Sequence, residues 1–552
     1  MTTRNRMEYL INYELIDAEP PTISLLNDLR ERGINTLSVV GEEDDSPVMD
    51  IRPASAGNGF RLAIGGERCS EQCKGAAPLL CSVPLITAQA LGAEAFRKAY
   101  STGYAYYAGS MAKGISSVDM VIALGRAGYM GAFGTGGLSL TEVSKGIDRI
   151  KAYLPEGPYL VNLLHSPNNE EQEEQLISLY LRKSVRAIEA SAFVDVSPGL
   201  IRYRLAGLKK SQGLGIYAGN RIIAKVSRAE VAKKFLSPPD PEITASLLAK
   251  GLITVDQAKW SKEIPVADDV TVEADSGGHT DNGPLISLLP RIISVRDEAQ
   301  RCYRYQQPIR VGAAGGIGTA ISAAGAFMMG ADYVVTGSVN QACLEAGTSD
   351  YVKQLLARVD MADVVMAPSA DMFEYGGRVQ VIKSGTMFPM NAQKLYELYV
   401  NYSCLEDIPE KDINAVEKRL FHCSCDAVWT QVKEYFDRVD PGKIRNAEQN
   451  GKLKMALIFR WYLGNSSRWA ISGDLNRRMD MQIWCGKSIG AFNEWVRGTE
   501  LESPGNRTVV AVADKIMSEA AFITMQYYLK YALKCAGENM DDTISYDSTA
   551  TG

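Results

Sequence analysis

Eight short apolar segments alternate with helical segments between residues 104 and 338. This alternation indicates parallel strands that are connected by helices. After Ile317, for example, apolar or small residues at positions 320, 321, 324, 327 and 328 form one face of a helix. Eight strands close a (β/α)8 TIM barrel, the α/β fold that we predict, and a doubly wound open sheet is the alternative. The predicted strands are residues 104–109, 130–134, 159–164, 187–193, 222–227, 270–275, 309–314 and 333–338.

Composition changes along the chain suggest further parts on either side of the barrel. The lead-in has an acidic loop at 41–47, and five of the six tryptophans lie between residues 367 and 508. Apolar residues at helical spacing from Val509 to Tyr527 predict one long amphipathic helix that packs back on the barrel. The predicted organisation is a lead-in (1–78), the barrel (79–365), an inserted helical substrate and carrier-protein domain (366–508), a final barrel helix (509–535) and a polar tail (536–552).

Charge and cysteine content exclude several classes of protein. The chain has 59 Lys and Arg against 65 Asp and Glu, a net charge of −6, so we expect no nucleic-acid partner. Ten cysteines in 552 residues are too sparse for a disulfide scaffold, which is typical of a reduced, cytoplasmic protein. His422 precedes Cys423 and Cys425, but this spacing cannot close a zinc tetrahedron without distant ligands, so we predict no metal site.

Two segments bear on membrane association. Glu8, Asn12 and Glu14 interrupt the apolar character of the first fifteen residues, so we expect no signal peptide there. Residues 311–331 carry no charge, but they are rich in Gly and Ala, and two adjacent glycines split them into a strand and a helix. We therefore interpret this window as buried α/β core and expect no membrane span.

Two glycine-rich turns follow the last two predicted strands. Gly315, Gly316 and Ile317 come after the seventh strand, and Gly337 and Ser338 come after the eighth. The loops after strands seven and eight of such barrels commonly bind phosphate through backbone N–H groups. The alternative is that these glycines only permit close packing of helix on strand.

A third turn carries the ionisable residues of the predicted site. Asp275 ends the sixth strand, and Gly277, Gly278 and His279 follow it. Two glycines allow the backbone to approach a flat ligand, and His279 could donate a hydrogen bond or a proton to a carbonyl. The alternative is a histidine whose ring is satisfied by a backbone carbonyl in a turn.

Polar residues on or after other strands complete the candidate set. Lys225 lies within an apolar strand and requires a partner, either a ligand or an internal acid such as Glu189 or Glu273. Asn162 lies in another apolar strand and also requires a partner. Ser110 and Met111 follow the first strand, where they line a ligand or form a tight turn.

These motifs together resemble a known enzyme family. The segments AGSMAKGISS, VNLLHSP, AKVSR, VEADSGGHTDNGP and GAAGGIGTAISAAGAFMMGADYVVTGSVNQA are similar to the FMN-dependent nitronate monooxygenase and enoyl-ACP reductase II superfamily. The aromatic segments 402–412, 428–436, 455–474 and 481–498 resemble its PfaD-type branch, the trans-acting enoyl reductases of polyketide and polyunsaturated fatty acid synthases. Asp275 and Ser276 stand where nitronate monooxygenases tend to have Glu and Ala, which favours the reductase branch.

The resemblance implies a barrel that binds FMN and uses NADPH as reductant. In this sequence Gly315, Gly316, Gly337 and Ser338 would hold the FMN phosphate, and Lys225 would lie near the pyrimidine edge of the flavin. His279 would be the active-site histidine. The flavin would be lined by the remaining positions of the motifs, namely Ser110, Met111, Asn162, Asp275, Gly277 and Gly278.

The implied activity is reduction of the 2,3-double bond of an enoyl thioester on an acyl carrier protein. The implied partners are that carrier protein and a polyketide or fatty acid synthase, and a homodimer is possible. Oxidation of nitronates and a non-catalytic flavoprotein scaffold are the alternatives. We expect carrier docking on a basic cluster of Lys452, Lys454, Arg460, Arg468, Arg477 and Arg478, whose alternative is a solvated helix face.

Overall fold

The computed structural model describes residues 86–165, 170–211 and 215–531, together with the backbone of four earlier strands and the end of the last helix. The chain forms two compact units, one of Gly92–Ala513 and one of Met1–Leu91 with Asp514–Gly552. The smaller unit contains antiparallel strands that close in the order β1-β3-β2-β4. These are β1 (Tyr9–Ile16), β2 (Thr36–Gly41), β3 (Phe60–Cys69) and β4 (Ala77–Pro84).

The larger unit contains the predicted eight-stranded parallel barrel. Its strands close in chain order, β5 to β8 followed by β11 to β14, and each of the eight lies within one predicted segment or one residue of it. The fold prediction is therefore confirmed, and the open-sheet alternative is wrong. The strands are β5 (Tyr106–Ala108), β6 (Met130–Phe133), β7 (Leu160–Leu164), β8 (Ala187–Ser191), β11 (Arg221–Val226), β12 (Asp269–Glu273), β13 (Arg310–Ala314) and β14 (Tyr333–Thr336).

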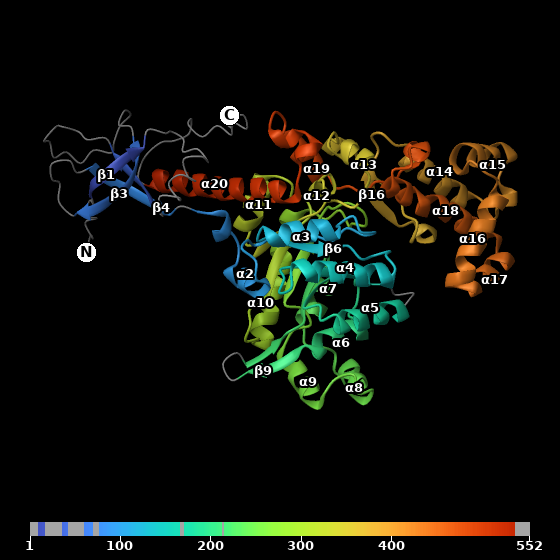
Figure 1. Cartoon of the computed structure of the whole chain (residues 1–552), viewed down its shortest axis with the longest axis horizontal. Helices are drawn as coiled ribbons and strands as arrows, with labels where there is room; N and C mark the ends of the chain where they lie inside the picture. Colours follow the sequence, from blue (N-terminus) through green and yellow to red (C-terminus); the bar gives the residue numbers. More distant parts are fainter. Residues whose placement is uncertain are drawn as a thin grey trace. The chain divides into compact units, whose positions relative to one another are not determined.

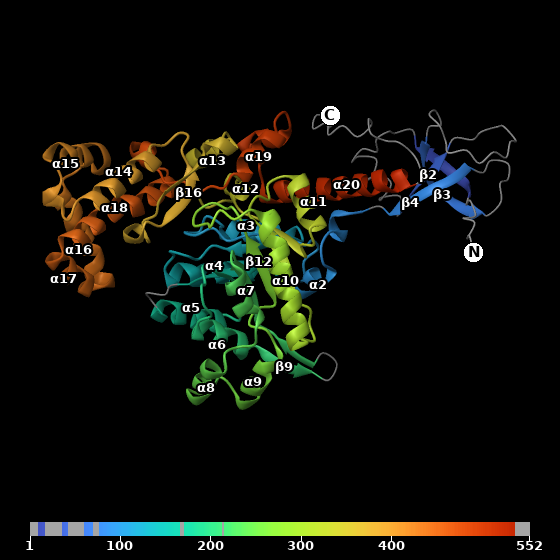
Figure 2. The same cartoon turned by 180° about the vertical axis from the view of Figure 1, so that it is seen from behind.

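Helices surround these strands, as Figures 1 and 2 show from opposite sides. Their caps follow the sequence: Ser139 caps α4, and Asp240, directly before a proline, caps α8. The helices around the barrel are α2 (Glu94–Tyr100), α3 (Val118–Arg126), α4 (Leu140–Tyr153), α5 (Glu170–Arg182), α6 (Pro198–Ala206), α7 (Ala229–Leu236), α8 (Pro241–Ala249), α10 (Leu285–Tyr303) and α11 (Ala320–Met328).

The interior of the barrel is filled by side chains. The Tyr107 hydroxyl lies 3.2 Å from Glu189 Oε1 and 3.1 Å from Thr271 Oγ1, and Thr271 Oγ1 lies 2.9 Å from the Tyr333 hydroxyl. Gly312 makes room for this layer, because a Cβ there would lie 2.1 Å from the Tyr333 ring. A packed interior restricts ligands to the two ends of the barrel.

Charged residues pair with one another at the amino-terminal end of the strands. Arg310 donates to both carboxylate oxygens of Asp269, at 2.5 and 2.7 Å, and the Tyr100 hydroxyl donates to Asp269 at 2.5 Å. Arg204 donates to Asp268 next to them. These fully paired groups stabilise the barrel and leave its carboxyl-terminal end for chemistry.

The insertion after β14 contains a hairpin as well as helices. β15 (Val364–Pro368) and β16 (Arg378–Ile382) pair antiparallel, because their β-branched residues favour strands over the helix that we predicted for this region. Phe373, Phe388, Phe459 and Tyr462 contribute to a separate hydrophobic core. The helices of the insertion include α14 (Phe388–Asn401), α15 (Glu410–Val416), α16 (Cys425–Val439), α17 (Pro441–Gln449), α18 (Gly451–Ser472) and α19 (Ser488–Trp495).

The part boundaries differ from those drawn from the sequence. Strand β4 includes position 78, where we ended the lead-in, and the larger compact unit begins only at Gly92. Helix α20 (Val509–Cys535) belongs to the larger unit only up to Ala513. The polar tail 536–552 and much of the lead-in lie outside the described residues. Among the helices that are described, none is both long and apolar enough to cross a membrane.

Candidate active site

The structure brings four of the predicted loops to one side of the barrel mouth. Strands β12, β13, β14 and β5 are consecutive neighbours, and the loops after them carry His279, Gly316, Ser338 and Ser110 in that order. Parallel strands end on the same side of the barrel, so these loops share its carboxyl-terminal face. The two glycine-rich turns are adjacent, as the sequence predicted.

The glycines of these turns have two different roles. Gly315 and Gly316 have left-handed backbones, with φ of +83° and +75°. A Cβ on Gly315 would lie 2.6 Å from the backbone of Ala274, so this glycine permits close packing. Gly316 and Gly337 instead face open space, with no atom within 4 Å of a Cβ on either residue.

Backbone donors are free at the same turns. Within the described residues, the N–H groups of Gly316, Ile317, Gly337 and Ser338 make no hydrogen bond. Unpaired backbone N–H groups around open space are a suitable site for phosphate oxygens. The residues present therefore fit the phosphate of FMN.

The double glycine in the loop after β12 contacts the insertion. Gly278 N donates to Gln380 O at 3.0 Å, and Gln380 N donates back to Gly278 O at 2.7 Å. Gln380 Nε2 also donates to Ser276 O at 3.0 Å. A Cβ on Gly277 would lie 2.9 Å from the backbone of Cys485. Close backbone approach at Gly277 thus serves contact with the insertion, whereas we had expected it to serve a flat ligand.

Other side chains of this region also cross to the insertion. Ser338 Oγ accepts a hydrogen bond from Gly486 N at 2.8 Å, and Asp275 Oδ2 lies 3.1 Å from Lys487 Nζ. The buried atoms Asp275 Oδ1 and Ser276 Oγ have no protein partner. Residues of both the barrel and the insertion therefore form the mouth.

His279 is paired with an acid that the sequence did not reveal. Its Nε2 lies 3.0 Å from Oδ2 of Asp371, in the loop after β15, and its side chain is 51% exposed. The hydrogen bond to Asp371 raises the pKa of His279, an effect that partial burial opposes and the charges of Asp371 and Glu273 reinforce. Burial is the largest single influence on the pKa of Asp371 and raises it, but the hydrogen bond from His279, the charge of His279 and smaller hydrogen bonds together lower that pKa. The pair thus keeps a proton donor available beside the mouth.

Lys225 has the internal acid partners that we weighed as an alternative. Its Nζ lies 2.7 Å from Glu273 Oε1 and 4.0 Å from Glu189 Oε1. Burial lowers the pKa of Lys225, but the two carboxylates outweigh this effect and raise the pKa above its usual value. Glu189 is fully buried and accepts a hydrogen bond from Ser110 N at 3.0 Å. The loop after β5 is therefore anchored to a charged network inside the barrel.

Asn162 and Met111 are held by neighbouring protein groups. Asn162 Nδ2 donates to Ser191 Oγ at 2.9 Å and to the carbonyl of Glu189 at 3.2 Å. Met111 N donates to Ser116 Oγ at 2.9 Å. These bonds satisfy the partner that we required for Asn162 and fix the turn after β5.

The basic cluster of the insertion does not form one docking surface. Lys452 donates to the carbonyls of Tyr399 and Tyr402. Arg460 pairs with Glu374 at 2.8 Å. Arg477 has structural partners as well, namely Asp480 and two backbone carbonyls. These three cations stabilise the insertion, so the predicted patch is wrong for them.

Comparison with known proteins identifies the family. Residues 96–395 match the family model described as nitronate monooxygenase, and this match covers more than half of the chain. The chain belongs to the nitronate monooxygenase family. Residues 402–481 match a second model, the inserted helical domain of [acyl-carrier-protein] S-malonyltransferase. The family match thus covers the barrel, and the second match covers α15 to α18.

Individual relatives place the chain in the PfaD-type enoyl reductase branch of this family. It is 48% identical over 439 residues to polyketide biosynthesis protein PksE of Bacillus subtilis, covering 79% of this chain and 57% of PksE. It is 44% identical over 468 residues to a polyunsaturated fatty acid synthase subunit of Thraustochytrium, covering 84% of this chain and 31% of that relative. The chain thus spans only part of these two relatives.

A solved structure of this branch covers both the barrel and the insertion. The enoyl reductase domain of MlnA, from the macrolactin biosynthesis cluster of Bacillus amyloliquefaciens, is 42% identical, with a TM-score of 0.77. The match covers 80% of this chain and 99% of that domain. That domain therefore shares both the barrel and the insertion with this chain.

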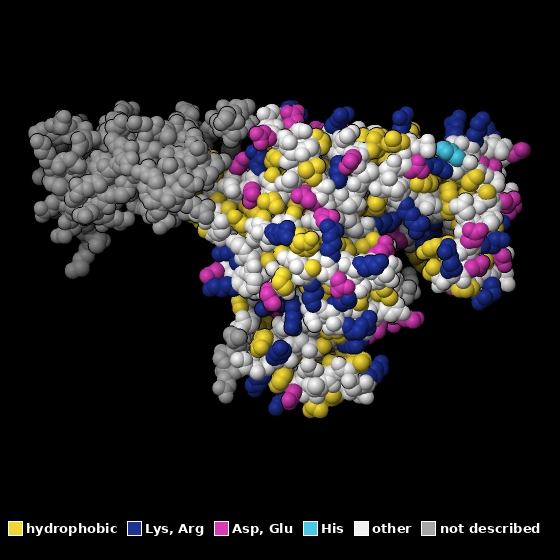
Figure 3. All heavy atoms as spheres, viewed as in Figure 1, with side chains coloured by type: hydrophobic (Ala, Val, Ile, Leu, Met, Phe, Trp, Pro, Cys, Tyr) yellow, Lys and Arg dark blue, Asp and Glu magenta, His cyan; other side chains and the backbone are white. Residues whose placement is uncertain are grey.

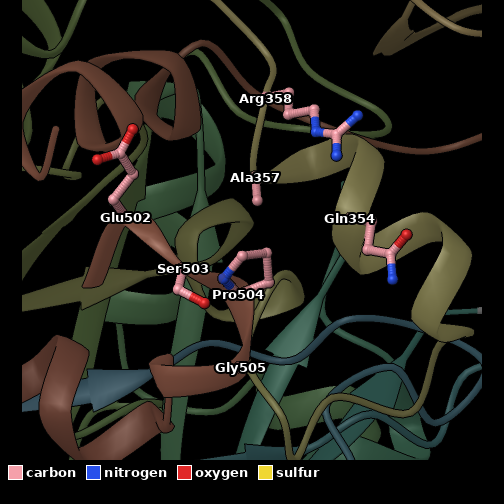
Figure 4. A pocket seen from close by; sticks show the side chains of 7 residues that line it. All are labelled: Gln354, Ala357, Arg358, Glu502, Ser503, Pro504 and Gly505. Atoms are coloured by element: carbon pink, nitrogen blue, oxygen red, sulfur yellow. The ribbon is translucent and has the colours of Figure 1, made fainter. Parts of the chain in front are cut away.

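Cavities among the described residues also lie outside the mouth. One of about 510 Å³ is lined by Gln354, Ala357 and Arg358 and by residues 502–505, as Figure 4 shows. Another of about 400 Å³ lies at the amino-terminal end of the barrel, where Arg221 and Arg310 begin their strands. No predicted site residue lines either cavity. The polar groups at the mouth therefore define the candidate active site.

Proposed function

We propose that the chain is an FMN-dependent, NADPH-using enoyl reductase that acts on the 2,3-double bond of thioesters bound to an acyl carrier protein. The observation that carries this proposal is the likeness to an enoyl reductase domain over barrel and insertion together. The relatives from polyketide biosynthesis and from a polyunsaturated fatty acid synthase support a role beside a synthase of one of these two kinds.

The phosphate of FMN would be held by the free N–H groups of Gly316, Ile317, Gly337 and Ser338. The chemistry that FMN supplies when bound is hydride transfer from a reduced nicotinamide to carbon. Lys225 stays charged between Glu273 and Glu189, so these two acids would hold its ammonium in a fixed position at the top of the barrel.

The His279 imidazole would act on the thioester. Asp371 orients the ring and favours its charged form, so His279 can donate a hydrogen bond to the carbonyl oxygen. Negative charge develops on this oxygen when hydride reaches the β-carbon, which makes the bond stronger in the transition state. Half of the His279 side chain is exposed, so a substrate that enters from solvent can reach it.

The insertion would receive the carrier-bound substrate. Its backbone contacts the loop that carries His279 through Gln380, and part of it matches a domain of an enzyme named for acyl carrier protein. A tethered substrate docked on the insertion would therefore meet the mouth without a long path.

The visible spectrum of the purified protein tests the cofactor, and half-reactions test the activity. We expect a flavin spectrum that NADPH bleaches under anaerobic conditions more rapidly than NADH. We then expect crotonyl-carrier protein to restore the colour and to yield the butyryl thioester. Folded protein that neither contains nor takes up FMN would overturn the proposal, and so would reduced protein that leaves both carrier-bound and free crotonyl thioesters unchanged.

Nitronate oxidation is a second candidate, because the matched family model carries that description. It requires oxygen and a nitronate but no NADPH. Oxygen uptake with the nitronate of 2-nitropropane, in the absence of nicotinamide, measures it directly. We expect this rate to be far below the rate of enoyl reduction.

A further inference from the structure

Lys113 lies in the loop after β5, at the edge of the mouth. It has a left-handed backbone with φ of +58°, which is uncommon for a residue other than glycine. Lys113 N donates to Gly136 O at 2.6 Å, and Gly114 N donates to Gly134 O at 2.9 Å. These bonds fix the position from which the lysine side chain extends.

The Lys113 ammonium contacts the insertion. Its Nζ donates to Ser467 Oγ on α18 and lies 5.4 Å from the centre of the Trp484 ring. Among the described residues, no carboxylate lies within 4 Å of it. The hydroxyl and the ring hold the ammonium but do not neutralise its charge.

A second cation lies next to this lysine. Arg468 follows Ser467 on α18, its side chain is exposed, and it forms no ion pair within the described part of the chain. Burial, and then the nearby charge of Arg468, lower the pKa of Lys113 to about 8. Two like charges that oppose each other in this way would both be stabilised by a shared anion.

Several partly buried cations in the described part of the chain have acid partners. Lys225 pairs with Glu273, Arg310 with Asp269, and Arg460 with Glu374. Lys113, which is held only by a hydroxyl and an aromatic ring, differs from these three cations. In Figure 3, Lys and Arg side chains also gather where the insertion meets the barrel.

Trp484 connects this pair of cations to the active-site loop. Its ring lies 4.0 Å from the Cβ position of Gly278, directly before His279. The same ring lies beneath Lys113 Nζ. An anion between Lys113 and Arg468 would therefore be separated from the loop of His279 by the Trp484 ring.

We propose that Lys113 and Arg468 form a binding site for a phosphate group of the molecule that enters the mouth. This inference rests on the proposed function, which supplies two phosphate-bearing molecules. One is the phosphopantetheine arm of the carrier-bound thioester, and the other is the nicotinamide dinucleotide. Both present the same chemistry, a phosphate joined to an extended organic chain, and the FMN phosphate has its own turns at Gly316 and Gly337.

Calorimetry on the full, FMN-loaded chain tests the site without turnover. The probes are 4′-phosphopantetheine, pantetheine and NADPH, and the variants are Lys113→Met and Arg468→Ala. We expect each variant to weaken a phosphate-bearing probe about tenfold, because a charge-assisted bond is lost. Pantetheine binding should not change. A loss confined to phosphopantetheine assigns the site to the carrier arm, and a loss confined to NADPH assigns it to the dinucleotide.

Control variants separate the site from folding and from general charge. Lys145→Ala removes an exposed lysine on α4 and should change none of the three affinities. Lys113→Arg keeps the charge and should retain most of the phosphate-dependent affinity. Flavin content and the unfolding midpoint show whether each variant is folded.

Unchanged affinities for both phosphate-bearing probes would overturn the site, as would an equal loss for pantetheine. Failure of the proposed function would give a different result. If only the proposed function is wrong, FMN-loaded protein would still distinguish phosphopantetheine from pantetheine but would not reduce crotonyl thioesters.

Discussion

His279 Nε2 and Asp371 Oδ2 lie 3.0 Å apart, although one residue follows a barrel strand and the other follows the first strand of the insertion. This bond joins the two parts of the larger unit through a titratable group. It raises the pKa of His279 and lowers that of Asp371, so each partner favours the charged form of the other.

Replacing Asp371 should move the pH dependence of the reaction. Asp371→Asn removes the main cause of the raised His279 pKa, so that pKa falls. If protonated His279 assists the thioester, the decline of kcat/KM with rising pH should begin at lower pH in this variant. Titration of the His279 ring by NMR, with kcat/KM for crotonyl-carrier protein measured over the same range, checks this. An unchanged decline in kcat/KM would exclude His279 as the titrating group.

The same bond should affect stability in a defined pH window. The His279 pKa is raised in the folded state, so the stabilisation is full below the unfolded value of about 6.5. It is then lost as pH rises through the folded pKa. The difference in unfolding free energy between the parent chain and Asp371→Asn should therefore be larger at pH 5.5 than at pH 8.5. Urea unfolding at the two pH values measures it.

Removing Lys225 should destabilise the barrel. Lys225→Met leaves the fully buried Glu189 and the nearby Glu273 without their cation, at a cost of about 3–5 kcal/mol. Denaturant unfolding measures the loss. The double variant Lys225→Met/Glu189→Gln should recover part of it, because one buried charge is removed. No recovery would show that the two residues do not interact.

The glycine turns allow a test of cofactor binding that does not disturb the fold. A Cβ on Gly337 meets no protein atom within 4 Å, so Gly337→Ala should change stability by less than about 1 kcal/mol. The added methyl group occupies space proposed for the FMN phosphate and should weaken FMN about tenfold. Fluorescence titration of the apoprotein measures this affinity.

Gly325→Ala is the matched control for that variant. Gly325 lies inside α11 and also faces open space, so alanine should stabilise the helix by about 1 kcal/mol and leave FMN affinity unchanged. Equal FMN affinity in Gly337→Ala and the parent chain would place the phosphate elsewhere.

Arg477 should behave as a structural residue. It donates to the carbonyls of Leu420 and Phe421 and to Asp480, and it lies 4.3 Å from the Trp469 ring. Arg477→Ala should therefore cost about 3 kcal/mol in thermal or urea unfolding, because buried acceptors lose their donor. The exposed neighbour Arg478→Ala should have little effect. A selective rise in KM for carrier-bound substrate, with stability unchanged, would instead support docking at Arg477.

The strands could be predicted because each is buried on both faces and is therefore mostly apolar in sequence. Gly316 and Gly337 could be predicted because glycine-rich turns after the last two strands have a specific use in this fold. The two partners possible for Lys225 could be named, but only distances show that Glu273 lies closer than Glu189.

Asp371 and Trp484 could not be predicted, because both reach the mouth only after the insertion folds back on the barrel. No spacing or periodicity near either residue records a contact so distant in sequence. Arg477 illustrates the converse limit. The presence of an arginine in the sequence does not show whether its side chain faces solvent or, as here, donates to two carbonyls of its own domain.

Gly278 and Gln380 meet through their main chains, each giving one donor and one acceptor. Every residue except proline carries these groups, so this link does not depend on which side chain evolution places at position 380. The side chains of the insertion could therefore change while the histidine loop keeps its place. Such a link would let one barrel carry insertions with different surfaces without being rebuilt.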